Sequence, residues 1–306
     1  MRVLVTGASG FVGGHLIDAL CQSPSVQRIL SVSRTPTNRK AGSLSWRESA
    51  YTAQDLMAAV QEFEPSHIVH LAAQSSVAAS LDGKLSDIPS AIAVTKAVIE
   101  AANNSSSVKR VIFSSSVEVY GAAFNSGHAL TEADGPLPTS PYAKAKLIAE
   151  LMFGDLLRQD IGLTILRPSN HFGAGQSSKF ALSSFASQIA SLPAEGGLIK
   201  VGNLDAQRDF LSVSDVVRAY MKVLESTVLR EILNVSSEQS RKISDVLKDM
   251  IFVSGKTVQL MTDQSRLRPS EVPIARVNSA SLRERYGWKP EEDWLRSLAL
   301  LIASYE

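Results

Sequence analysis

The pattern at the start of the chain restricts the fold more than any other feature. Arg2–Thr6 has the composition of a short buried strand, a glycine-rich turn follows at Gly7, Gly10 and Gly13, and an apolar-periodic helix comes next. Gly7 permits a tight turn, Gly10 lets the backbone approach a pyrophosphate, and Gly13 lets the helix pack closely on the strand. A helix N-terminus adds amide donors and partial positive charge for phosphates. The unit predicts dinucleotide binding.

Short β-branched runs alternate with helical patterns through the first half of the chain. The expected strands are Arg2–Thr6, Arg28–Val32, His67–Leu71, Val111–Ser115 and Leu163–Arg167. The expected helices are Gly13–Gln22, Ala53–Phe63, Asp87–Asn103 and Pro141–Arg158. Strands separated by helices of this length indicate right-handed crossovers and a parallel sheet. The predicted class is α/β, a doubly wound parallel Rossmann sheet with a smaller, discontinuous C-terminal substrate lobe.

The sequence pattern changes after Arg167. Polar loops become more frequent, and the expected helices are shorter and lie around 177–192, 242–252 and 292–304. Asp209–Glu225 resembles a return to the core domain, and another strand is expected near Ile232–Val235. We therefore predict a dinucleotide-binding domain from residues 1–167 plus 209–236. Residues 168–208 plus 237–306 are expected to form the substrate lobe.

Bulk properties narrow the class of protein. The chain has 306 residues, of which 44% are hydrophobic and 20% charged, with a net charge of +1. This charge gives no reason to expect a nucleic-acid or membrane partner. The single cysteine, Cys21, excludes an internal disulfide and a cysteine metal cluster, and no metal site is expected. With no signal peptide before the glycine loop and no apolar run long enough to span a bilayer, we expect a cytoplasmic protein.

Tyr142 and Lys146 form the first candidate catalytic pair. Ser140 and Pro141 are typical of a helix start, so the tyrosine and lysine, four residues apart, share one helix face. An ammonium beside a phenol favours the phenolate, so we expect the pKa of Tyr142 to fall from about 10 towards neutrality. Such a phenol can donate or accept a proton in catalysis.

Five motifs extend this pair into a family resemblance. They are Thr6–Gly13, His70-Leu-Ala-Ala73, Ser114-Ser-Ser116 with Tyr120-Gly121, Tyr142 with Lys146, and Arg167-Pro-Ser-Asn170. Their order resembles that of the extended short-chain dehydrogenases/reductases that act on nucleotide sugars, over nearly the whole chain.

The resemblance implies roles for individual residues. Ser116 would hydrogen-bond the reacting oxygen, Tyr142 would exchange a proton with it, and Lys146 would hold the nicotinamide ribose and tune the tyrosine. The residues expected to bind the cofactor are Gly7, Ser9, Gly10, Phe11, Val12, Gly13, Ser33, Arg34, Leu71, Ala72, Ala73, Ser114, Tyr142 and Lys146.

The end of the second expected strand bears on the choice of cofactor. An acidic residue there would accept from the 2′-hydroxyl of NAD, whereas this chain has Ser33 and Arg34, with Arg39 and Lys40 nearby. A hydroxyl and a guanidinium suit a 2′-phosphate, so NADP(H) is expected and NAD(H) stays possible. The usual adenine-holding aspartate has no clear equivalent in Leu44–Glu48.

The C-terminal half favours a substrate. Arg167–Gln176, Val201–Phe210 and Leu267–Pro273 resemble the GDP-mannose branch of the family, particularly reductases of GDP-4-keto-6-deoxy-mannose that form GDP-D-rhamnose. The resemblance implies that Arg208 and Arg268 clamp a diphosphate, arginine being suited to bidentate phosphate contacts. The residues expected to bind the GDP-linked keto-deoxy sugar are Glu118, Asn170, Val201, Arg208, Arg268 and Glu271.

Related activities stay open. Glu118 stands at the position of the base in GDP-mannose and other nucleotide-sugar dehydratases, but Val117 between it and Ser116 moves no protons. An epimerase-reductase of the GDP-fucose type is excluded, because it needs a cysteine near the serine and Cys21 is the only cysteine. A UDP-sugar 4-epimerase fits the first half, and a non-catalytic NADP-binding sensor is a remote alternative. By analogy a homodimer is expected, joined as a four-helix bundle through helices near 87–103 and 141–158.

Overall fold

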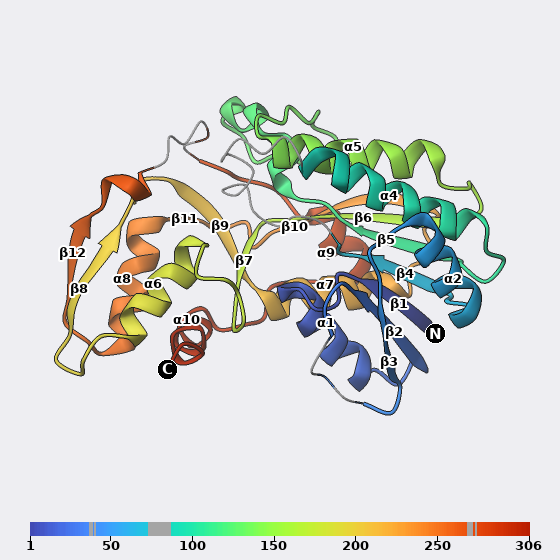
Figure 1. The fold of residues 1–306 in the computed structure, drawn as a ribbon. Coiled ribbons are helices and arrows are strands. Elements are labelled where there is room, and N and C mark those ends of the chain that lie inside the picture. Colours follow the sequence, from blue (N-terminus) through green and yellow to red (C-terminus); the bar gives the residue numbers. More distant parts are fainter. Residues whose placement is uncertain (37–38, 40, 73–86, 268–271, 273) are drawn as a thin grey trace.

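The dominant element of the protein is a parallel sheet (Figure 1). The computed structural model describes residues 1–36, 39, 41–72, 87–267, 272 and 274–306, and in these the sheet has seven strands in the order β10-β6-β5-β4-β1-β2-β3. Every neighbouring pair is parallel, which confirms the doubly wound sheet. The strands are β1 (Arg2–Thr6), β2 (Arg28–Ser33), β3 (Leu44–Glu48), β4 (His67–His70), β5 (Arg110–Ser114), β6 (Gly162–Pro168) and β10 (Arg230–Val235).

Helices cover both faces of this sheet (Figure 1). One face carries α1 (Phe11–Gln22) and α7 (Val213–Leu224), and the other carries α2 (Ala53–Phe63), α4 (Asp87–Asn103) and α5 (Pro141–Leu156). The short α9 (Ala280–Tyr286) packs near β10. The helices expected at 53–63 and 87–103 have those bounds, whereas α1 begins earlier, at Phe11, and α5 ends earlier, at Leu156.

The strand β3 was absent from the expected strands. Its side chains are mostly exposed, with Trp46 38% accessible, because it lies at the edge of the sheet and pairs only with β2. An edge strand needs no apolar run, so periodicity gave no signal for it.

The second half of the chain adds a smaller lobe around the helices α6 (Ala181–Ala190), α8 (Ile243–Ser254) and α10 (Trp294–Ala303), which share one apolar core. Its strands are β7 (Asn170–Phe172), β8 (Gly197–Val201), β9 (Gln207–Ser212), β11 (Ser240–Lys242) and β12 (Val258–Thr262). Short 3₁₀ turns are η1 (Val117–Tyr120), η2 (Ala122–Ser126) and η3 (Gln264–Arg266). The expected domain boundary at residue 209 falls inside β9, which spans Gln207–Ser212. The division into two domains stays a prediction.

The sheet reverses its strand order between β1 and β4, and this reversal positions the site. Doubly wound sheets bind ligands beyond the carboxyl ends of the strands at such a switch point. Thr6 ends β1 and aligns with His70 of β4 and Val32 of β2. The Leu71-Ala72 backbone after β4 packs directly against Gly7 of the glycine-rich turn at this switch point.

Candidate active site

The glycine-rich turn has the geometry that its sequence predicted. Gly7 adopts a φ of +73°, and a Cβ there would lie 2.7 Å from the backbone nitrogen of Ala72. A Cβ on Gly13 would lie 2.3 Å from the Gly7 carbonyl oxygen, so only glycine permits this packing. Among the described residues no side chain caps α1 and no acidic residue lies in its first turn. The free amides of this helix N-terminus fit a pyrophosphate.

The predicted catalytic side chains meet beyond the end of β5. Ser116 caps η1, where its hydroxyl accepts from the backbone N–H of Glu118 at 3.2 Å. Ser140 caps α5, accepting from the Ala143 N–H at 3.1 Å, so Tyr142 and Lys146 lie on the first turns of that helix as expected. The Lys146 ammonium donates to the Ser114 carbonyl at 2.5 Å.

The expectation for the pKa of Tyr142 is wrong. Burial raises the pKa of Tyr142 to about 12, against the lowering effect of the Ser116 hydroxyl, and the Glu118 carboxylate raises it further. The Lys146 ammonium lies 6.0 Å from the centre of the tyrosine ring and points instead to the Ser114 carbonyl. Helical spacing brought the two residues together but did not fix the direction of the ammonium. Tyr142 is therefore a neutral phenol at neutral pH, a form that donates a proton.

Lys146 is buried within the same cluster, with 7% of its surface exposed. Burial lowers the pKa of Lys146 to about 8, while the carboxylate of Glu150 opposes that change. Its ammonium also lies 5.1 Å from the ring centre of Phe113. The lysine keeps its charge at neutral pH, with donors available to a ribose.

A buried ion pair that the sequence did not reveal fixes α5 against the sheet. Arg167 on β6 donates to both carboxylate oxygens of Glu150, at 2.9 and 2.6 Å, and to the Tyr120 hydroxyl at 3.0 Å. Ser115 also donates to Glu150. Glu150 lies one helical turn beyond Lys146, so this network holds the helix that carries the candidate pair.

Two of the predicted substrate residues, Glu118 and Arg208, are close enough to affect each other's pKa. Burial raises the pKa of Glu118, and the nearby Arg208 guanidinium opposes this rise. Burial likewise lowers the pKa of Arg208 on β9, with the Glu118 carboxylate opposing. Asn170 begins β7, the strand beside β9. Glu118 also affects the pKa of Tyr142, so the Glu118–Arg208 pair lies near the candidate catalytic tyrosine.

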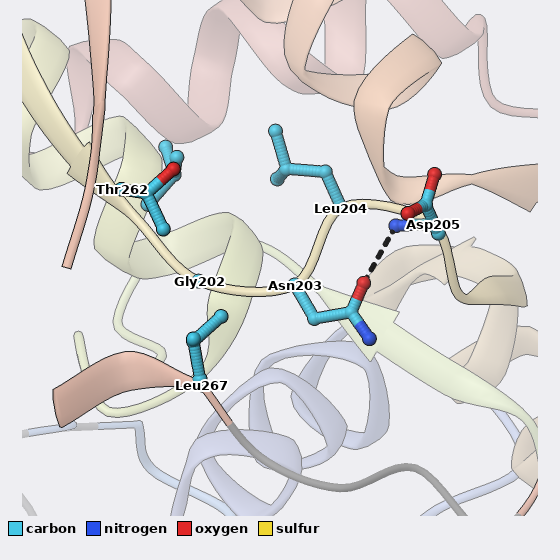
Figure 2. Close-up of a pocket in the computed structure, with 7 residues that line it drawn as sticks. Gly202, Asn203, Leu204, Asp205, Thr262 and Leu267 are labelled. Atoms are coloured by element: carbon cyan, nitrogen blue, oxygen red, sulfur yellow. Dashed lines mark hydrogen bonds between the residues drawn. The ribbon is translucent and has the colours of Figure 1, made fainter. Parts of the chain in front are cut away.

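Val201 lies in a cavity of about 630 Å³ in the smaller lobe. Its walls are Val201, Gly202, Asn203, Leu204, Asp205, Thr262 and Leu267. Figure 2 shows the Asn203 side chain turned back, so that its oxygen accepts from the backbone N–H of Asp205 at 2.9 Å. Mixed apolar and polar walls suit a nucleoside. The predicted residues Ala73, Arg268 and Glu271 lie outside the described part of the chain.

The residues predicted to choose the cofactor lie after β2. The Ser33 hydroxyl is buried, donates to the Thr35 carbonyl at 2.6 Å and accepts from the Trp46 indole at 3.0 Å. Arg34 is exposed. The Arg39 guanidinium pairs with Asp18 at 2.7 Å and lies against Gly14, next to the glycine-rich turn. Lys40 lies outside the described residues, and the roles of the others in binding stay predictions.

Two buried tyrosines near this site escaped the sequence interpretation. Tyr220 on α7 is 1% exposed, and burial raises its pKa, an effect that the Tyr142 phenol increases and the Ser114 hydroxyl reduces. Tyr51 hydrogen-bonds Gly7. The Tyr51–Gly7 hydrogen bond and the proximity of Tyr220 to Tyr142 join residues far apart in sequence, so no local pattern could predict them.

In the part of the chain that the structure describes, no three His, Cys, Asp or Glu side chains gather as a metal site would require. No helix within it is long and apolar enough to cross a membrane.

The doubly wound sheet, glycine-rich turn and Ser-Tyr-Lys cluster define a dinucleotide-dependent oxidoreductase. The chain belongs to the NAD dependent epimerase/dehydratase family, whose model matches residues 3–236. The GDP-6-deoxy-D-mannose reductase of Pseudomonas aeruginosa is 29% identical over 100% of this chain and 97% of that protein. The UDP-glucose 4-epimerase of Mycolicibacterium smegmatis is 29% identical over 95% of this chain and 94% of its own.

Solved structures of other proteins share this fold over nearly the whole chain. The structure of RMD from Pseudomonas aeruginosa complexed with NADPH has a TM-score of 0.79 and 26% identity, covering 99% of this chain and 98% of that one. The UDP-glucose 4-epimerase of Thermotoga maritima has a TM-score of 0.88 at 24% identity, covering 100% and 98%, and shows the fold alone. The protein is therefore an NAD(P)-dependent enzyme of the group that comprises the nucleotide-sugar reductases, epimerases and dehydratases.

Proposed function

We propose that the protein reduces the C4 ketone of GDP-4-keto-6-deoxy-D-mannose to form GDP-D-rhamnose, with NADPH as the reductant. The observation that carries the proposal is the full-length similarity to a GDP-6-deoxy-D-mannose reductase. The neutral Tyr142 phenol adds chemical support, because reduction of a ketone consumes a proton.

Each member of the cluster then has a role. When bound, NADPH would supply the hydride for the ketone carbon. Tyr142 donates its phenolic proton to the ketone oxygen as negative charge develops there, and Ser116 donates a hydrogen bond to the same oxygen. Lys146 binds the nicotinamide ribose, and its positive charge stabilises the tyrosinate that remains.

The smaller lobe would hold the nucleotide end of the substrate. The cavity at Val201 has room and mixed polarity for the base, and Arg208 would contact the diphosphate. Asn170 would hydrogen-bond the sugar or a phosphate. The charge of Glu118 beside Arg208 would orient a sugar hydroxyl near the reacting carbon.

A nucleotide-sugar dehydratase is the second candidate, because one observation favours it. Glu118 is close enough for its carboxylate to raise the pKa of Tyr142, and burial raises the pKa of Glu118 itself, which makes this carboxylate a stronger base. Val117, which lies buried between Glu118 and Ser116, offers no proton-transfer group.

The test is oxidation of NADPH, followed by absorbance, with GDP-4-keto-6-deoxy-mannose as one substrate and GDP-mannose and UDP-glucose as parallel substrates. Oxidation with the keto-sugar alone supports the reductase. A keto-sugar that appears from GDP-mannose would instead make the protein a dehydratase. UDP-galactose formed from UDP-glucose would make it an epimerase.

Tyr142→Phe should reduce turnover by about 10²–10⁴-fold while NADPH affinity changes little. Wild-type turnover in this variant would refute the role of Tyr142 as proton donor.

We further propose a homodimer through α4 and α5, which lie side by side (Figure 1). Leu151 and Leu156 on α5 are 57% and 54% exposed, an apolar surface that a partner would cover. Sedimentation equilibrium should give a dimer, and Leu151→Lys should weaken it; a wild-type monomer at micromolar concentration would contradict this proposal.

We also propose that the protein is cytoplasmic. Its dinucleotide-binding domain would comprise residues 1–167 plus 209–236, and its substrate lobe residues 168–208 plus 237–306.

A further inference from the structure

Tyr51 has a backbone conformation that large side chains rarely adopt. Its φ is 62°, and among the described residues only Glu64 and Glu238 are other non-glycine residues with a positive φ. Glu64 ends α2, a place where left-handed residues are common. Tyr51 instead lies between β3 and α2 with its side chain only 9% exposed. A buried aromatic held in this conformation is a genuine outlier of the kind found at functional sites.

The phenol of Tyr51 hydrogen-bonds the ends of two neighbouring strands, β1 and β2. Its hydroxyl donates to the Val32 carbonyl of β2 at 3.0 Å and accepts from the backbone N–H of Gly7 at 2.9 Å. Gly7 also donates to the Val32 carbonyl at 3.0 Å, so the three groups form a closed triangle. The Tyr51 backbone is itself fixed, because its N–H donates to the Ser49 hydroxyl at 2.8 Å.

Gly7 transmits this contact to the cofactor turn. Its carbonyl accepts from the Gly10 N–H at 3.0 Å, and the Gly10 carbonyl accepts from the Gly14 N–H at 2.9 Å, within the first turn of α1. A continuous series of hydrogen bonds therefore joins the Tyr51 hydroxyl to the helix N-terminus that fits a pyrophosphate. The backbone of Ala72 packs against Gly7 on another side.

We propose that Tyr51 is a positioning residue that fixes the glycine-rich turn in the conformation that binds the adenosine-pyrophosphate half of the cofactor. The residue touches no reacting group, so its effect falls on cofactor affinity and not on proton or hydride transfer. Loss of one such buried hydrogen-bonding group should weaken binding about tenfold. The same weakening is expected for NADPH and for 2′-phospho-ADP-ribose, which lacks the nicotinamide.

The experiment compares Tyr51→Phe with Tyr286→Phe. The phenol of Tyr286 also has two partners, Glu231 and Ser226, but these lie at the start of β10 and in the loop before it, away from the turn. Isothermal titration with NADPH and with 2′-phospho-ADP-ribose gives the affinities, and thermal unfolding reports stability. A tenfold rise in both dissociation constants for Tyr51→Phe only, with turnover at saturating NADPH unchanged, supports the proposal.

A second measurement keeps the test decisive if the phenylalanine protein is too unstable for titration. The rise in unfolding temperature caused by saturating 2′-phospho-ADP-ribose should then be smaller for Tyr51→Phe than for Tyr286→Phe. Wild-type affinity, or a wild-type rise in unfolding temperature, in Tyr51→Phe would overturn the proposal. So would equal weakening in Tyr286→Phe, since it would mark the effect as one of general stability.

Discussion

Replacing Arg167 with methionine is expected to destabilise the protein by about 3–5 kcal/mol, because it leaves the Glu150 carboxylate buried without its charged partner. Both side chains are 4% exposed, and Arg167 donates to both oxygens of Glu150 and to the Tyr120 hydroxyl. The pKa of Arg167 is raised by that carboxylate, although burial alone would lower it. A loss of this size approaches the whole stability of many domains.

The double variant Glu150→Met/Arg167→Met should recover most of that loss. Two methionines fill a similar volume without a buried charge, and such replacements are often neutral. Ser115 would lose the carboxylate to which it donates, at a cost of about 1–2 kcal/mol. We therefore expect the double variant to be only about 1–2 kcal/mol less stable than the wild type.

Urea unfolding followed by far-UV circular dichroism measures the two single variants and the double variant as one thermodynamic cycle. The expected result is strong coupling, with the double variant more stable than Arg167→Met. If the two single effects instead add in the double variant, the buried pair does not hold α5 to the sheet, and the reasoning fails.

Three further predictions follow from the fold. Gly13→Ala places a methyl group 2.3 Å from the Gly7 carbonyl oxygen and should abolish measurable NADPH binding in titration, whereas retained affinity would contradict the packing of the turn. Gly154→Ala in α5 meets open space and should raise stability by about 0.5–1 kcal/mol in urea unfolding; a loss would show a contact there. The pKa of buried His70 is lowered to about 3, so the unfolded chain binds more protons below pH 6.5. This histidine alone should lower the stability by about 1.4 kcal/mol for each pH unit between 6.5 and 3, and His67, whose pKa burial lowers to about 4, adds to that slope. His70→Gln should therefore reduce the slope measured by urea unfolding by about 1.4 kcal/mol per pH unit, and an unchanged slope would contradict the prediction.

Local patterns in the sequence predicted the parts of the fold that local forces determine. The glycine-rich turn, the capped start of α5 and the alternation of strands and helices all follow from short-range preferences. The edge strand β3 and the short strands β7 and β11 depend on pairing with distant segments. Their sequences carry no periodicity of their own, so they escaped prediction.

In the candidate site, too, local features were predicted from the sequence, whereas contacts between distant residues were not. Helical spacing placed Tyr142 and Lys146 together, but the direction of the Lys146 ammonium depends on the Ser114 carbonyl, 32 residues earlier. The predicted fall in the pKa of Tyr142 was wrong mainly because burial in the folded protein disfavours the phenolate. The contact of Tyr51 with Gly7 spans 44 residues, so it too became visible only in the folded protein.

The central claim is direct reduction of a sugar ketone at C4. The most direct measurement uses NADPH dideuterated at C4 of the nicotinamide with GDP-4-keto-6-deoxy-mannose, and reads the product by proton NMR. The account predicts one deuterium at C4 of the new sugar, with NADPH consumed in equal amount. A product without deuterium, or no consumption of NADPH, would contradict it.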